Sequence, residues 1–149
     1  MIDKFNVRVY GLLVKDHKIL LSREQIDDFK MLKFPGGGLE FGEGLRQAMI
    51  RELKEELEIE PDRLEQFYIA EEYVQSKLRA NEQVIAVYYR IEHQNAISLK
   101  PKVQDTAFGN KNELEFELRQ LNESLVDELS FETDKQALTR LMKSINTKD

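Results

Sequence analysis

Apolar and polar positions divide the chain into short strand-like runs and two longer helix-like stretches. Runs rich in β-branched, aromatic and aliphatic residues predict strands at 5–14, 19–22, 32–35, 66–74, 84–91 and 113–121. Apolar side chains recur at helical spacing over 45–57 and 131–145, which predicts two amphipathic helices. The order β-β-β-α-β-β-β-α predicts a mixed β-sheet with helices packed on it, an α/β (α+β) fold.

Two polar segments between these runs are expected to be loops. Residues 23–31 are rich in charge, and residues 94–112 contain Pro101, Gly109 and several Asn and Lys without a clear period. Long loops in compact domains often carry function. No repeat, linker or second hydrophobic unit interrupts the 149 residues, so we expect 1–149 to form a single domain.

Composition narrows the classes of site. The chain has no cysteine and two histidines, which excludes disulfide scaffolds and thiolate metal sites and argues against a histidine-based zinc enzyme. Its formal net charge is −6, which is a poor match for long nucleic acid. It has neither an apolar run of about 18 residues nor a signal-peptide core, so we expect a soluble, cytoplasmic protein without a membrane partner.

The excess acidity belongs to one stretch of the chain. Residues 40–72 carry eleven acidic and four basic side chains. Such a cluster is either a solvated helix face or a site for hard cations.

Three carboxylates fall on one face of the helix predicted over 45–57. Glu52, Glu55 and Glu56 are spaced to lie together, with the small Ala48 one turn earlier, while Lys54 points elsewhere. Like charges at this spacing weaken a helix by about 0.2–0.5 kcal/mol per pair. A divalent cation removes that repulsion, and carboxylates suit Mg²⁺ or Mn²⁺. The opposite stripe is apolar and is expected to be buried: Met49, Ile50, Leu53 and Leu57.

A glycine triplet precedes this helix. Gly36, Gly37 and Gly38 permit positive φ angles and a backbone nest that favours anionic groups such as phosphate. The stretch matches neither the P-loop nor the dinucleotide fingerprint. A plain turn is the other interpretation of these glycines.

The glycine triplet and the acidic helix together resemble the Nudix box, GX5EX7REUXEEXGU, where U is an aliphatic residue. The matching residues are Gly37, Glu43, Arg51, Glu52, Leu53, Glu55, Glu56 and Ile59. Glu58 stands where the family usually has Gly, so we expect a shifted helix end and unchanged metal chemistry. Segments 20–23, 34–37 and 115–123 also resemble the family, with Leu118 where a Trp is frequent.

The resemblance implies a Nudix-like α/β/α sandwich that hydrolyses a nucleoside diphosphate linked to another moiety with Mg²⁺ or Mn²⁺. It assigns the metal to Glu52, Glu55 and Glu56, and it makes Arg51 and Glu43 supporting groups that hold the carboxylates. Candidates for the general base are Glu56, then Glu115 and Glu113. Arg23 is either a phosphate contact or a solvent-facing arginine.

Several alternatives stay open from the sequence. A non-catalytic, nucleotide-sensing Nudix-like domain is the second interpretation of function, and a structural protein with a solvated acidic helix is a third. The substrate is unnamed, because residues 73–76 lack the Pro of the ADP-ribose class and Tyr73 stands early for the dinucleoside-polyphosphate class. The resemblance also implies a homodimer. Runs 5–14 and 84–91, which are apolar on both faces, must be covered either by helices of the chain or by a partner.

Overall fold

The fold comprises strands and helices in both halves of the sequence. The computed structural model describes residues 1–105 and 111–146. Across these residues the elements are, in chain order, β1 (Lys4–Lys15), β2 (Lys18–Ile26), β3 (Phe29–Lys33), β4 (Gly36–Gly38), α1 (Leu45–Leu57), β5 (Arg63–Ile69), β6 (Glu82–Glu92), β7 (Lys102–Asp105), β8 (Lys111–Gln120), α2 (Glu123–Glu128) and α3 (Glu132–Asn146). In the part of the chain thus described, no helix is long and apolar enough to cross a membrane.

The strands form one mixed sheet whose two halves meet at a hairpin. Their order is β5-β6-β1-β2-β8-β7, with β3 paired to β2 and β4 paired to β1. β1 and β6 run parallel, whereas the other pairs are antiparallel. β1 and β2 pair only next to the turn that joins them, where Val14 lies opposite Ile19 and Lys15 lies opposite Lys18. The chain crosses from the β2 half to the β1 half at Phe34–Pro35, between β3 and β4.

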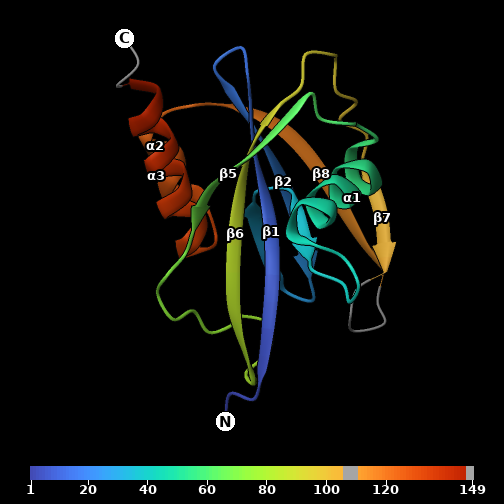
Figure 1. Ribbon diagram of the computed structural model, residues 1–149, viewed down its shortest axis with the longest axis vertical. Coiled ribbons are helices and arrows are strands. Elements are labelled where there is room, and N and C mark those ends of the chain that lie inside the picture. The colour runs from blue at the N-terminus through green and yellow to red at the C-terminus, as the bar shows by residue number, and fades with distance from the viewer. Residues whose placement is uncertain (106–110, 147–149) are drawn as a thin grey trace.

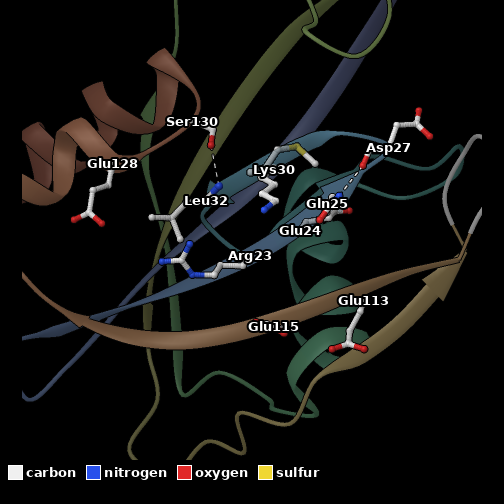
Figure 2. Close-up of a pocket in the computed structure, with 11 residues that line it drawn as sticks. Arg23, Glu24, Gln25, Asp27, Lys30, Leu32, Glu113, Glu115, Glu128 and Ser130 are labelled. Carbon is white, nitrogen blue, oxygen red and sulfur yellow. Dashed lines mark hydrogen bonds between the residues drawn. The ribbon is translucent and has the colours of Figure 1, made fainter.

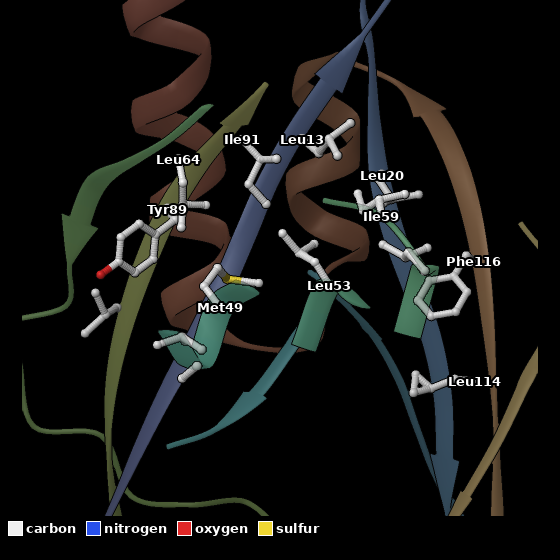
Figure 3. Packing of buried hydrophobic residues seen from close by; sticks show 14 residues of the cluster. Leu13, Leu20, Met49, Leu53, Ile59, Leu64, Tyr89, Ile91, Leu114 and Phe116 are labelled. Carbon is white, nitrogen blue, oxygen red and sulfur yellow. The ribbon is translucent and has the colours of Figure 1, made fainter. Parts of the chain in front are cut away.

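Helices cover both faces of the sheet, which confirms the expected sandwich. Figure 1 shows α1 on one side of the strands and the α2–α3 pair on the other. Successive β1 residues alternate between two cores, since Val9 and Leu13 pack under α1 whereas Tyr10 and Leu12 pack under α2 and α3. Figure 3 shows the core under α1, which includes Leu13, Leu20, Met49, Leu53, Ile59, Leu64, Tyr89, Ile91, Leu114 and Phe116.

The apolar runs in β1 and β6 are therefore covered within one chain. In β6, Val87, Tyr89 and Ile91 face the α1 core, and Ala86 and Tyr88 face the other. Two-sided burial of these strands needs no partner copy.

The expected loops are where the sequence prediction is wrong. Residues 23–31 are not a loop, because β2 continues to Ile26 and β3 begins at Phe29, with those two residues paired. Alternate charged residues of these strands lie exposed, which makes the composition resemble that of a loop. The loop predicted over 94–112 contains β7 and the start of β8, while residues 106–110 lie outside the described residues. β7 is a polar strand at the edge of the sheet, where charged sequences are common.

Helix boundaries are predicted better than strand boundaries. The structure has α1 over the predicted 45–57, but Ile50 is 38% exposed, so the expected apolar stripe loses one member. The strand predicted over 66–74 is β5, which begins and ends earlier. The glycine triplet is a short strand, β4.

Candidate active site

The acidic helix is fixed at both ends by backbone hydrogen bonds. At its start the Gly44 N–H donates to the Gln47 side-chain oxygen over 2.6 Å. At its end Glu58 adopts a left-handed conformation, φ 57° and ψ 35°, and its N–H donates to the Lys54 carbonyl. Glu58 thus takes the conformation that glycine adopts at no steric cost, and the expected shift of the helix end does not occur.

Arg51 links the box into one hydrogen-bonded cluster. Its Nε and Nη2 donate to both oxygens of Glu43, over 3.0 and 2.7 Å. Its Nη1 donates to Glu52 over 3.0 Å and to Glu55 over 3.3 Å, and Nη2 also reaches the Gly38 carbonyl. These bonds raise the pKa of Arg51, with Glu43 the largest cause, and hydrogen bonding to Arg51 lowers the pKa of Glu43. A bidentate arginine–carboxylate pair of this kind fixes position as well as charge.

Gly37 makes room for the Glu52 carboxylate. A Cβ at Gly37 would lie 2.2 Å from Glu52 Oε1, so any side chain there would force the Glu52 carboxylate to move. Gly36 has φ 151°, and a Cβ there would lie 2.0 Å from the Val9 carbonyl oxygen. Gly36 is therefore required by close packing against the β1 backbone, and Gly37 leaves the space that the Glu52 carboxylate fills.

The expected phosphate nest is not formed by Gly36, Gly37 and Gly38. They pair with Tyr10, Val9 and Arg8 of β1, and ladder bonds from Gly11 to Pro35 and from Leu39 to Val7 bracket them. Gly36 and Gly37 are buried, and β4 ends well before α1 begins. Strand pairing, rather than an anion-binding loop, accounts for the triplet.

Glu56 is a buried carboxylate with an unfilled hydrogen-bonding position. It is 4% exposed, and its Oε2 has no hydrogen-bond partner among the described residues. Burial raises the pKa of Glu56 to about 8; Glu52 and Glu24 also raise it, and the Lys33 ammonium opposes the rise. A buried carboxylate that lacks partners is costly unless a cation or ligand satisfies it.

The donor set and the orphaned oxygen fit a hard divalent cation. Glu52, 12% exposed, and Glu56 supply carboxylate oxygens, with that of Glu52 against Gly37, whereas Glu55 is 57% exposed at the rim. Within residues 1–105 and 111–146, no three His, Asp or Glu side chains already converge as a metal cage. In this structure Arg51 donates to one oxygen of Glu52 and one of Glu55.

Two predicted site residues lie on the far face of the sheet. Arg23 pairs in register with Glu115 on β8, and the neighbouring positions Leu114 and Phe116 are the ones that face α1. Arg23 donates instead to Glu117 over 3.1 Å, and Figure 2 shows it on the side of β2 that faces Glu128 of α2 and Ser130. Arg23 and Glu115 line an open groove of about 840 Å³ together with residues of β2, β3 and the end of α2. The structure does not bring them to Glu56.

Glu113 faces away from α1, as Glu115 does. It is exposed, and in register its position alternates with that of Leu114 in the α1 core. The sequence shows that polar and apolar residues alternate along this strand. It does not show which of the two faces α1 covers.

The structure adds Arg8, Glu24 and Lys33, which the sequence analysis missed. Lys33 is 4% exposed, and its Nζ lies 3.8 Å from Glu24 Oε2, beyond hydrogen-bond distance. Arg8 Nε donates to the Tyr10 hydroxyl over 2.7 Å, and Arg8 Nη1 lies 3.7 Å from where a Cβ on Gly38 would be. The Tyr10 oxygen, the largest cause, raises the pKa of Arg8, and Glu52 and Glu24 add to the rise. No signal in the sequence marks these residues, because they come together only when β1, β2 and β3 meet.

A cavity opens next to these residues. We call it the β1 cavity; its volume is about 440 Å³, and its lining includes Asn6, Arg8, Tyr10, Lys33, Glu82 and Phe131. In the described part of the chain, no hydrogen-bond acceptor is found for the Nη atoms of Arg8, whereas Lys33 forms an ion pair with Glu24; both cationic residues line the cavity. The site thus combines a carboxylate cluster, which can hold cations, with an adjoining cavity whose cationic wall can hold anions.

Comparison with known proteins assigns this site to a family. A family model for the NUDIX domain matches residues 4–135. The ADP-ribose pyrophosphatase of Methanocaldococcus jannaschii is 43% identical over 56 residues, 37% of this chain and 33% of that protein. The CTP pyrophosphohydrolase of Escherichia coli is 44% identical over 54 residues, 35% of this chain and 40% of that protein. The matches thus span about a third and two fifths of the lengths of these relatives.

Solved structures share the fold over nearly the whole chain. A MutT Nudix hydrolase from Burkholderia pseudomallei matches with a TM-score of 0.65 at 21% identity, covering 92% of this chain and 98% of the other. The solution structure of the Escherichia coli ORF135 protein matches with a TM-score of 0.66 at 20% identity, covering 94% and 90%. Because the family model covers most of the sequence, the chain belongs to the Nudix family.

Proposed function

We propose that this protein hydrolyses the diphosphate linkage of a nucleoside diphosphate joined to another group, with Mg²⁺ or Mn²⁺ bound at the box. Nudix hydrolases generally need divalent cations and act on small nucleotides. The proposal depends above all on one observation: the buried Oε2 of Glu56 has no hydrogen-bond partner among the described residues. The neighbouring β1 cavity has the cationic residues Arg8 and Lys33 in its lining.

The box residues have distinct roles in this proposal. Glu52, Glu55 and Glu56 hold the metal, which neutralises phosphate oxygens and lowers the pKa of a water molecule. Glu56 is our first candidate for the group that takes the proton from the attacking water, because its buried Oε2 has no hydrogen-bond partner among the described residues and can accept one. Arg51 and Glu43 position the carboxylates through the paired hydrogen bonds between them.

We assign phosphate binding to residues other than those predicted from the sequence. Arg23 is held by Glu117 on the far face, and the glycine triplet is paired to β1. Arg8 and Lys33 place two positive charges in the wall of the β1 cavity, so we assign phosphate oxygens of the substrate to them. The nucleoside then occupies the β1 cavity.

A substrate screen tests the proposal. Nucleoside triphosphates, nucleotide sugars, ADP-ribose and dinucleoside polyphosphates are incubated with Mg²⁺, Mn²⁺ or EDTA, and products are resolved by anion-exchange chromatography. The named relatives make ADP-ribose and CTP the first two compounds to test. We expect cleavage at a diphosphate in at least one class, and its loss in EDTA. The absence of turnover with every class and both metals would overturn the proposal.

A nucleotide-sensing, non-catalytic domain is the second candidate. It is favoured by the outward position of Glu55 and by the lack of a ready-made three-ligand cage in the described residues. Nucleotide binding by calorimetry, without turnover in the screen, would select it.

We also propose that residues 1–149 act as one domain. The protein works in the cytoplasm, where free nucleotides are its substrates. It forms a homodimer, as the family resemblance implies. The family model, which covers residues 4–135, supports the single domain. Light scattering across a dilution series tests the dimer, and a mass of 17.5 kDa throughout would exclude it.

A further inference from the structure

The wall of the β1 cavity formed by β1 and β6 presents its polar side chains in a row. Tyr10, Arg8 and Asn6 alternate along one face of β1, and the parallel neighbour β6 adds Glu82 in register with Lys4. At about 3.3 Å per residue, Glu82 lies roughly 13 Å along the strand from Arg8. The phosphate donors therefore stand at the box end of the cavity, and Glu82 stands at the far end.

Glu82 is a buried carboxylate with acceptor capacity to spare. The residue is 7% exposed, and its Oε1 and Oε2 each accept one bond, from Arg79 over 3.2 Å and from Asn6 over 3.3 Å. A carboxylate offers about four lone-pair sites and donates nothing when ionised. Two further acceptor sites are thus available where Glu82 lines the cavity.

An acceptor-only group discriminates between donors and acceptors on a ligand. An exocyclic amino group placed there donates a charge-assisted hydrogen bond, whereas a keto oxygen meets a second set of lone pairs and loses its water. Sites built around a hydrogen bond reject the analogue that lacks it.

We propose that Glu82 is a specificity-determining residue that accepts a hydrogen bond from the amino group of a nucleobase, so that cytosine, adenine or guanine nucleotides are preferred over uracil or hypoxanthine nucleotides. This inference rests on the proposed function for its substrate, with the phosphates at the box and the base at Glu82. Phe131 supplies an aromatic wall to the same cavity, suited to the face of a base.

The test compares matched base pairs in four proteins: the wild type, Glu82→Gln, Glu82→Asp and the control Glu92→Gln, an exposed residue at the end of the same strand. The value of kcat/KM is measured for CTP against UTP and for GTP against ITP, each pair differing in an amino group. In whichever pair the wild type turns over, we expect a preference of roughly tenfold or more for the amino-bearing base. Glu82→Gln, whose amide also donates, should bring the ratio near unity, while Glu82→Asp and Glu92→Gln retain the preference.

A binding measurement separates this inference from the proposed function. CMP and UMP are titrated calorimetrically without metal, where no hydrolysis can occur. Preferential CMP binding that Glu82→Gln abolishes would support the inference even if no nucleotide is hydrolysed. Equal turnover of both members of a pair by the wild type would overturn the inference and leave the proposed function standing. An equal loss for both members in Glu82→Gln, together with a lower melting temperature, would also overturn it, because Glu82 would then only hold Arg79 and Asn6.

Discussion

Two arginine–glutamate clusters lie on opposite faces of the sheet and differ in how tightly they are fixed. On the α1 face, Arg51 is 22% exposed and bonds Glu43, Glu52 and the Gly38 carbonyl. On the other face, the Arg23 side chain is 49% exposed and, among the described residues, bonds Glu117 alone. The same residue types thus form an over-determined cluster in one place and an ordinary surface pair in the other. Burial and the number of bonds, rather than residue type, mark the site.

A similar contrast separates the two most buried carboxylates. Glu56 and Asp134 are 4% and 1% exposed, and each has one oxygen without a hydrogen-bond partner among the described residues. Burial raises the pKa of both, to about 8 for Glu56 and about 6 for Asp134. Glu56 sits among further carboxylates, whereas Asp134 accepts a hydrogen bond from Tyr88 inside the apolar core under α3. Only the first arrangement is suited to a cation.

The largest expected effect is a difference in activity between variants of Glu56 and of Glu115. Glu56→Gln should lower kcat/KM by roughly two to four orders of magnitude, because a neutral amide is a weak ligand for a hard cation and a poor base. Glu115→Gln, on the far face, should change kcat/KM by less than about twofold. Steady-state kinetics on the substrate found in the screen measures both, with circular dichroism to confirm folding. Equal losses of activity in the two variants would contradict the assignment of Glu56, rather than Glu115, to the active site.

The next effect separates the two arginines by stability. Arg51→Gln leaves the carboxylates of Glu43 and Glu52 without their cation, so we expect a loss of about 2–3 kcal/mol in the free energy of unfolding. Arg23→Gln removes a largely exposed pair and should cost no more than about 0.5 kcal/mol. Urea unfolding in EDTA measures both without a contribution from bound metal. A loss in Arg51→Gln as small as that in Arg23→Gln would mean that the cluster is not over-determined.

A smaller effect concerns pH and the buried Asp134. Burial raises the pKa of Asp134 from 3.8 to about 6, so folding favours its protonated form. Its contribution to stability is full below about pH 4 and is lost as the pH rises through about 6. Relative to Asp134→Asn, which does not titrate, the wild type should lose about 2 kcal/mol of stability between pH 4 and pH 7. Parallel pH profiles for the two proteins, from urea unfolding, would show that Asp134 is ionised at no cost.

Much of the site was predictable because its residues are local in sequence. The helix over 45–57, its carboxylate face and the roles of Gly37, Glu43 and Arg51 depend on spacing along one segment, and spacing is visible in a sequence. The observed hydrogen bonds from Arg51 to Glu43 and Glu52 match the predicted supporting role.

The remaining parts depend on contacts between distant segments. Arg8, Lys33 and Glu82 come from three strands, and their meeting follows from the parallel pairing of β1 with β6 and the crossing at Phe34–Pro35. Arg23 and Glu115 were misplaced because alternation gives two faces without saying which one α1 covers. The charged strands β2 and β3 were mistaken for a loop because exposed strand faces have the composition of loops.

The smallest expected effect is at the end of α1, where the box departs from the family pattern. Glu58 has φ 57°, a conformation that costs a residue with a Cβ roughly 1–2 kcal/mol and costs glycine little in the folded state. Glycine loses more chain entropy on folding, by about 0.5–1 kcal/mol, so Glu58→Gly should stabilise the protein by a net of about 0.5–1 kcal/mol. Asp27, with φ 52° in the turn between β2 and β3, is the matched control on the other half of the sheet. Because aspartate tolerates this region better than glutamate, Asp27→Gly should gain less. Thermal melts of the two variants beside the wild type measure the difference, and a lower melting temperature for Glu58→Gly would show that the contacts of the Glu58 side chain outweigh its backbone strain.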